Sequence, residues 1–200
     1  MKKIPAALIY SRLGIGLLLL LFSCINVKNY STIAVTLFAV GLLTDIFDGI
    51  IARQLKISTQ NLRRLDSTVD QIFFLLVAIA TFINSRKFFV DNEVELIILI
   101  SVEALAYFIC FLKFKKEIAT HSIASKIWVL FLFATIVQVM LTRNSNGLFQ
   151  VCFYIGVATR LEIIVIILVL RKWTNDVPSI YQAVLLRQGK TIKRHKLFNG

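Results

Sequence analysis

The chain has 200 residues, of which 58% are hydrophobic, and it carries a formal net charge of +12. This apolar share exceeds that of an ordinary soluble domain, and a mean hydropathy of +0.78 agrees with it. The length fits one domain, and three isolated cysteines in apolar runs exclude a disulfide framework and a cysteine-ligated metal cluster.

Six apolar segments follow one another, each close to the ~20 residues that a helix needs to cross a bilayer. We place them at residues 6–27, 31–53, 66–84, 94–112, 122–142 and 148–170. The sequence therefore predicts an all-α integral membrane protein with six transmembrane helices and a C-terminal interfacial helix. We expect one six-helix domain over residues 1–174 and a basic, amphipathic cytoplasmic tail over residues 175–200. Pro178 suits the first turn of the tail helix, and Asp176 suits its cap.

The basic residues predict the orientation of these segments. With the N-terminus inside, sixteen Lys and Arg residues fall on the inner side and four on the outer side, so both termini are expected to be cytoplasmic. The positive charge also attracts anionic lipid headgroups. It is spread over the loops of a membrane protein and lacks the clustered footprint of a nucleic-acid-binding chain, so membrane lipids are expected as partners and nucleic acid is not.

Four aspartates interrupt the apolar pattern where the second and third segments approach each other. Asp45 and Asp48 share one face of a helix, and Asp66 and Asp70, four residues apart, share a face of the next. Four carboxylates near one membrane level cost on the order of 10 kcal/mol, which a bound cation would partly offset. An all-oxygen ligand set suits a hard divalent cation such as Mg²⁺, Mn²⁺ or Ca²⁺.

The stretch from Asp45 to Asp70 resembles the signature of the CDP-alcohol phosphatidyltransferases. That signature reads D-x2-D-G-x2-A-R, then eight residues, then G-x3-D-x3-D. Seven of its eight fixed positions match, at Asp45, Asp48, Gly49, Ala52, Arg53, Asp66 and Asp70. The eighth departs, because Leu62 stands where the signature has its second glycine.

The resemblance implies a reaction and roles for these residues. A phosphatidyl group would move from CDP-diacylglycerol to a small alcohol acceptor, with release of CMP. Two Mg²⁺ or Mn²⁺ ions would be held by the four aspartates, with Asp70 also acting as the base. Asp45, Gly49, Ala52 and Arg53 would bind the CDP group. The resemblance also implies a homodimer in a bacterial cytoplasmic membrane.

Three further cations lie within or beside the apolar segments: Arg12, Lys126 and Arg160. Few acids are near them in the sequence, so we interpret them as anion-binding residues for the acceptor, with structural ion pairing as the alternative. Two glutamates, Glu103 and Glu162, also lie within the apolar segments, and for them a structural ion pair is favoured over a catalytic role. Three cations favour an acceptor that carries a phosphate, so glycerol 3-phosphate is the first choice, followed by inositol phosphate and serine.

Two other function classes fit parts of the sequence. A divalent-cation transporter would use the same carboxylates along a path, but the outer halves of the segments are almost entirely apolar. A noncatalytic lipid-binding relative is weakly supported by Leu62. The sequence favours the transferase over both.

Overall fold

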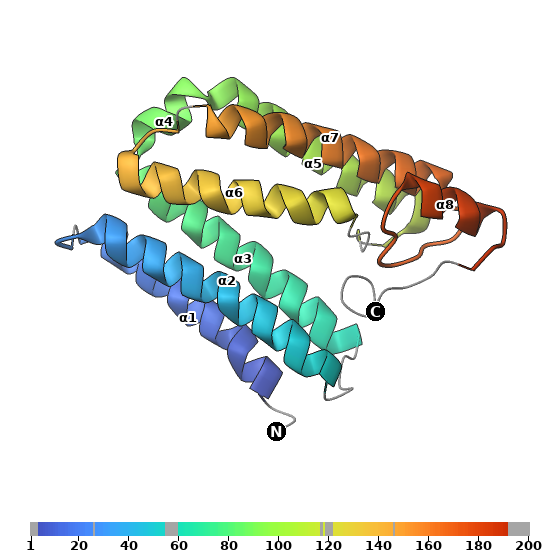
Figure 1. Ribbon diagram of the computed structural model, residues 1–200, viewed down its shortest axis with the longest axis horizontal. Helices are drawn as coiled ribbons and strands as arrows, with labels where there is room; N and C mark the ends of the chain where they lie inside the picture. The colour runs from blue at the N-terminus through green and yellow to red at the C-terminus, as the bar shows by residue number, and fades with distance from the viewer. Residues whose placement is uncertain are drawn as a thin grey trace. The chain divides into compact units, whose positions relative to one another are not determined.

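The computed structural model describes residues 4–25, 27–54, 60–116, 118, 122–145 and 147–191. Within these ranges the chain forms helices α1 to α8, and no residue is in a strand (Figure 1). The predicted all-α class is confirmed.

Six of the helices in the described ranges are long and apolar enough to cross a membrane. They are α1 (Ile4–Cys24), α2 (Tyr30–Gln54), α3 (Gln60–Asn84), α5 (Glu93–Phe114), α6 (Ile123–Thr142) and α7 (Leu148–Val169). Each matches one predicted segment. The largest difference is at the start of α3, which begins at Gln60 and not at residue 66, because polar first turns extend the helix beyond its apolar part.

Two short helices complete the described chain. One of them, α4 (Arg86–Asp91), was not predicted from the sequence, and its Phe88 is buried. α8 (Ile180–Arg187) is the expected tail helix, but it begins after Ser179, and the expected start at Pro178 with an Asp176 cap is wrong. The Pro178 carbonyl accepts a hydrogen bond from the Ile123 amide at 3.0 Å, which holds this proline in the preceding loop.

The backbone contacts divide the chain into two compact units. The first unit comprises Met1–Val90 and Ile136–Asn144, and the second comprises Asp91–Thr135 and Ser145–Gly200. The first unit therefore contains α1, α2, α3, most of α4 and the end of α6.

In the first unit, α1 packs against both α2 and α3 (Figure 1). Two glycines make the close approach possible. A Cβ on Gly41 of α2 would lie 2.3 Å from the Phe73 ring of α3, and one on Gly16 of α1 would lie 3.2 Å from the same ring. Phe73 also meets the Phe38 ring, with the two centroids 6.1 Å apart. A large aromatic side chain thus fills the space that two missing side chains leave.

In the second unit, α5 lies beside α7, and α8 covers the end of α7. Ile166, Leu170, Val177 and Ala183 form the buried cluster between α7 and α8. Since Ala183 faces this cluster, Tyr181 on another face of α8 is left 69% exposed. The expected position of α8 at a membrane surface stays a prediction.

Candidate metal centre

The acidic face of α2 belongs to the inward stripe of that helix. Ala34, Phe38 and Gly41 are buried at spacings of three and four residues, and Asp45 and Asp48 continue the same spacing. Ile46 and Phe47, between the two aspartates, are 48% and 52% exposed. The helical period therefore turns the carboxylates inward and the apolar side chains outward.

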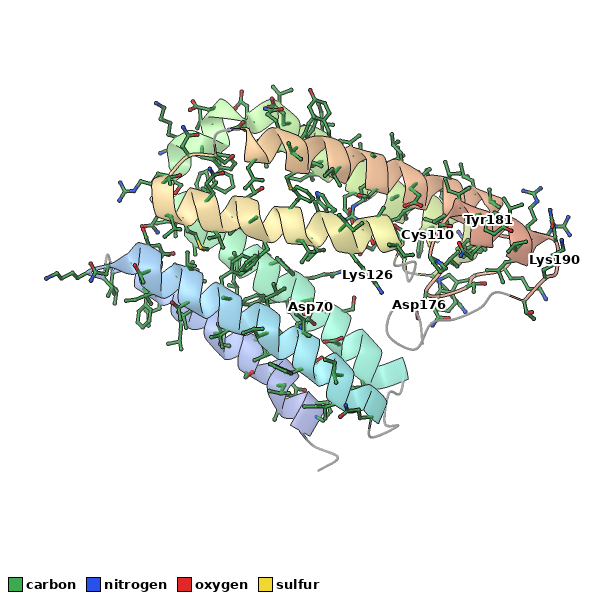
Figure 2. All side chains as sticks on the ribbon, viewed as in Figure 1. Asp70, Cys110, Lys126, Asp176, Tyr181 and Lys190 are labelled. Atoms are coloured by element: carbon green, nitrogen blue, oxygen red, sulfur yellow. The ribbon has the colours of Figure 1, made fainter. Side chains whose placement is uncertain are left out.

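The first part of α3 brings two more carboxylates to the same end of the helices. Asp66 lies near the start of α3. Asp70, which Figure 2 labels, lies one turn further along the helix. Carboxylate oxygens of Asp45, Asp48 and Asp66 all lie within 4.8 Å of one another. The predicted meeting of the two acidic faces is thus present in the structure.

Arg12 of α1 lies among these carboxylates. Its Nη1 donates to Asp45 Oδ1 at 2.8 Å, and its Nη2 donates to Asp66 Oδ1 at 2.5 Å. Nη2 also donates to Asp48 Oδ2, and Nη1 also pairs with Asp70 Oδ1. All four predicted metal ligands are therefore joined through one guanidinium group.

The cluster has a closed side and an open side. The Arg12 side chain is completely buried, and that of Asp48 is 3% exposed. The side chains of Asp45, Asp66 and Asp70 are 38%, 33% and 30% exposed. A ligand would therefore reach the cluster over these three carboxylates, while Arg12 and Asp48 form its floor.

The residues of the cluster fit a hard divalent cation. All four acidic donors are carboxylates, the ligand type that Mg²⁺ and Mn²⁺ prefer, and three of them already lie within the span of one binding site. One guanidinium neutralises a single charge among four carboxylates. The remaining negative charge, held within membrane-spanning helices, favours a further cation.

The other signature residues lie near the same helix ends. Gly49 follows Asp48 and is partly buried. Ala52 and Arg53 fall in the last turn of α2, and their side chains lie outside the described part of the structure. Leu62, in the first turn of α3, is partly buried. The predicted CDP site thus shares the ends of α2 and α3 with the carboxylates.

Arg160 and Lys126 belong to the second unit. Arg160 pairs with Glu103 of α5, and its guanidinium carbon lies 4.6 Å from the centre of the Trp128 ring. Trp128 is held in turn by a hydrogen bond from its Nε1 to the Cys152 carbonyl at 3.0 Å. Lys126 lies in the first turn of α6 and is exposed (Figure 2). The grouping of these two cations with Arg12 stays a prediction.

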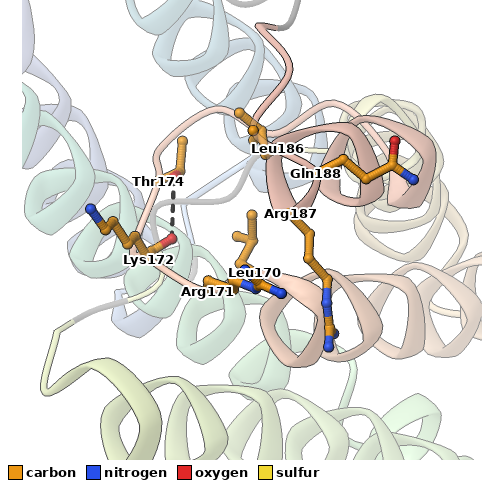
Figure 3. A pocket seen from close by; sticks show the side chains of 8 residues that line it. Leu170, Arg171, Lys172, Thr174, Leu186, Arg187 and Gln188 are labelled. Atoms are coloured by element: carbon orange, nitrogen blue, oxygen red, sulfur yellow. Dashed lines mark hydrogen bonds between the residues drawn. The ribbon is translucent and has the colours of Figure 1, made fainter.

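A basic pocket lies between the segment that follows α7 and the C-terminal end of α8. Its volume is about 480 Å³, and its basic lining residues are Arg171, Lys172 and Arg187 (Figure 3). The side chain of Thr174 and the backbone of Gly189 also line it. This location agrees with the predicted attraction of the tail to anionic lipid headgroups.

The six apolar helices indicate a multi-pass membrane protein, and the carboxylate cluster gives it a candidate cation site. Comparison with protein families gives a more specific result. The model of the CDP-alcohol phosphatidyltransferase family matches residues 2–170, which include all four aspartates. The chain belongs to this family of transferases, which move a phosphatidyl group from a CDP-alcohol to an alcohol acceptor and generally depend on a divalent metal. No curated protein and no solved structure matches the chain.

Proposed function

We propose that this protein transfers the phosphatidyl group of CDP-diacylglycerol to a small alcohol and releases CMP. The observation that carries the proposal is the meeting of Asp45, Asp48 and Asp66 within 4.8 Å on membrane-spanning helices of a family member. A lipid with a nucleotide headgroup places its chains in the bilayer and its pyrophosphate at the helix ends. The carboxylates lie within about three turns of the end of α2 and of the start of α3, which such a headgroup could reach.

Asp45, Asp48, Asp66 and Asp70 would hold Mg²⁺ or Mn²⁺, and four carboxylates suffice for two ions. When bound, such ions neutralise charge on the pyrophosphate and on the departing nucleotide. Phosphoryl transfer depends mainly on positioning and on charge stabilisation, so residues that fix the two substrates contribute most of the remaining rate.

Asp70 is the proposed base. Its side chain is 30% exposed, so an acceptor hydroxyl can approach it from the open side of the cluster. The hydroxyl oxygen forms a bond to the phosphatidyl phosphorus while its proton moves to a carboxylate oxygen of Asp70. The bond from phosphorus to the nucleotide phosphate oxygen breaks, and its electron pair leaves with CMP.

The CDP group would lie against the end of α2. We assign Asp45, Gly49, Ala52 and Arg53 to it, because the signature places them on one face of that helix. Leu62 of α3 would narrow the nucleotide side of the site relative to the glycine that the signature has there.

The acceptor is proposed to be glycerol 3-phosphate, with inositol phosphate and serine next. Lys126 is exposed, so its charge can meet an anion. Arg160 already pairs with Glu103, so its contribution to an acceptor site depends on sharing its guanidinium with that carboxylate. Arg12 can contribute only if it leaves the aspartates with which it pairs.

The test is a turnover assay with purified full-length protein, CDP-diacylglycerol and each acceptor in turn, with release of CMP as the readout. We expect CMP release with Mg²⁺ or Mn²⁺, most of all with glycerol 3-phosphate, and none after chelation. Asp48→Asn should abolish turnover, whereas Asp91→Asn, at the end of α4, should not. Full turnover in chelator would contradict the metal site, and the absence of CMP release with every acceptor would contradict the transferase.

A further inference from the structure

Arg12 connects the carboxylates in a specific pattern. Its Nη1 contacts Asp45 of α2 and Asp70 of α3. Its Nη2 contacts Asp48 of α2 and Asp66 of α3. Each terminal nitrogen thus joins one carboxylate from each helix. A cation held by these aspartates would use the same carboxylate groups that Arg12 contacts.

We propose that Arg12 occupies the cation site in the metal-free protein and competes with the divalent ion for the same carboxylate oxygens. The inference rests on the metal site of the proposed function. It gives Arg12 the role of a counter-ion that competes with the metal, which neither the signature nor the predicted acceptor site contains.

The burial of Arg12 supports this role. Arg12 continues the buried stripe of α1 between Ile9 and Gly16, a place where the helical period calls for an apolar side chain. Its guanidinium stays charged at any physiological pH, so it needs anionic partners there. The carboxylates supply them. Without a cation among them, they would repel one another within the membrane-spanning helices.

The hydrogen bonding of Arg12 is incomplete, which allows an ion to displace it. Its Nε is buried and has no hydrogen-bond partner, although a buried donor of this kind is normally satisfied. One guanidinium also brings a single positive charge, whereas a divalent ion brings two. The ion can therefore replace Arg12 at these oxygens with a gain in charge neutralisation, and the two cations repel each other if both remain.

Competition predicts the direction of a mutational effect. Arg12→Gln removes the competing charge, so the divalent ion should bind more tightly. The same change leaves the carboxylates without their counter-ion, so the metal-free protein should unfold at a lower temperature. A residue that only prepared the site for metal would have the opposite effect on metal affinity.

The experiment measures Mn²⁺ binding to the purified full-length protein in detergent after chelator treatment, from the paramagnetic resonance signal of free Mn²⁺. In the wild type the ion must break the charge-assisted hydrogen bonds of Arg12, and in Arg12→Gln these bonds are absent. We therefore expect Arg12→Gln to bind Mn²⁺ about tenfold to hundredfold more tightly than the wild type. Equal or weaker binding by the variant would overturn the inference.

Arg160→Gln is the matched control. It also removes a membrane-embedded arginine with a carboxylate partner, but that partner is Glu103 and not one of the aspartates. We expect it to leave Mn²⁺ affinity unchanged. Tighter binding by this control as well would assign the effect to net charge and overturn the specific role of Arg12.

Arg12→Lys provides the same test of Mn²⁺ binding if Arg12→Gln does not fold. An ammonium is a compact charge without the guanidinium fork, so it cannot bridge both carboxylate pairs as Arg12 does. We expect Mn²⁺ to bind this variant several-fold more tightly than the wild type, by the loss of part of the same hydrogen bonding. Binding no tighter than that of the wild type would overturn the inference.

Thermal unfolding followed by circular dichroism gives a second readout without turnover. Since the ion stabilises the state that it binds, Mn²⁺ should raise the unfolding midpoint of Arg12→Gln by more than that of the wild type. Equal increases contradict competition. If the wild type and the Arg12 variants bind Mn²⁺ equally well, competition is contradicted but the proposed function stands. If neither the wild type nor any variant binds Mn²⁺, both proposals are overturned.

Discussion

At the scale of single residues, the candidate site is a balance of buried charges. Arg12 is completely buried and Asp48 is nearly so, yet both lie within helices that are otherwise apolar. A lone charge in such a helix would cost about 2.5–3.5 kcal/mol on insertion scales. Their mutual contact lowers this cost. The same contact makes the function of each carboxylate depend on its neighbours.

Asp70 is the residue whose role can be separated from that of a simple ligand. Asp70→Asn keeps a neutral oxygen as a weak ligand but removes the proton acceptor. We expect CDP-diacylglycerol binding within about tenfold of the wild type and a turnover rate lower by roughly 10²–10⁴, the usual share of a general base. Calorimetric titration with a donor analogue, beside the turnover assay, measures both quantities.

Asp45→Asn is the comparison for this prediction, because Asp45 is assigned to metal and donor binding only. We expect its donor affinity and rate to fall together. A joint collapse in Asp70→Asn as well would make Asp70 chiefly a ligand, and a surviving rate would assign the base to another group.

The sequence predicted the four aspartates of the cluster but not the partner of Arg12. Spacing along α2 and α3 was enough to predict which carboxylates share a face. Few acids lie near Arg12 in the sequence, whereas its partners Asp45 and Asp66 lie 33 and 54 residues away. The same holds for Arg160, whose partner Glu103 lies on another helix. Contacts between helices are not encoded in local spacing.

At the scale of helices, the cluster depends on a close contact one turn away. Gly16 follows Arg12 by four residues, Gly41 precedes Asp45 by four, and Phe73 follows Asp70 by three. Phe73 fills the space at both glycines. The distance between the acidic faces of α2 and α3 is therefore set partly by an apolar contact next to them.

Gly41→Ala should destabilise the first unit. The new Cβ would lie 2.3 Å from the Phe73 ring, so either the ring or the helix must move. Overpacking of this kind costs about 1–3 kcal/mol. Phe73→Leu in the same chain should recover part of the loss, which a double-mutant cycle of thermal unfolding would measure.

Gly14→Ala provides the control, since no atom lies within 4 Å of its added Cβ. Alanine is the better helix former, so this variant should match or exceed the wild-type stability by up to about 1 kcal/mol. Equal stability of Gly41→Ala and Gly14→Ala would show that the contact with Phe73 does not limit the approach of α2 and α3.

The sequence predicted the long helices better than the short ones. Membrane-spanning segments are defined by length and apolar composition, which a single chain displays directly. α4 has only six residues, and its Phe88 is buried. Just before α4, Ser85 Oγ donates a hydrogen bond to the Val139 carbonyl at 3.3 Å. The position of α4 therefore depends on a contact with a residue that is distant in the sequence. The start of α8 was misplaced for a similar reason, because the contact between Pro178 and Ile123 joins distant residues.

At the scale of the whole molecule, the spans expose many large apolar side chains. Leu17 of α1, Ile100 of α5 and Leu130 of α6 are 58%, 69% and 63% exposed. Such surfaces are stable against lipid chains and would be unfavourable in water. The charges that remain lie mostly in the loops and the tail, and these predict which side of the membrane each loop faces.

Cysteine labelling tests that orientation in a background without the native cysteines. Lys28→Cys and Asn144→Cys, at exposed positions in loops expected to be outside, should react with an impermeant maleimide in intact cells. Lys116→Cys and Lys172→Cys should react only after the cells are permeabilised. The reverse pattern would place the carboxylate end of α2 and α3 outside, away from a cytoplasmic nucleotide lipid.

The position of Arg12 has a consequence for the way the chain is made. Arg12 precedes Asp45 by 33 residues and Asp66 by 54. During translation α1 is therefore synthesised before the carboxylates of α2 and α3 exist. The newly inserted α1 carries a positive charge that has none of these partners yet, and the membrane tolerates it best near the inner surface. Once α2 and α3 are inserted, their carboxylates can form ion pairs with Arg12 and so favour the packing of α1 against both helices. The ion pairs of Arg12 can therefore guide the packing of α1, α2 and α3 before a metal ion binds.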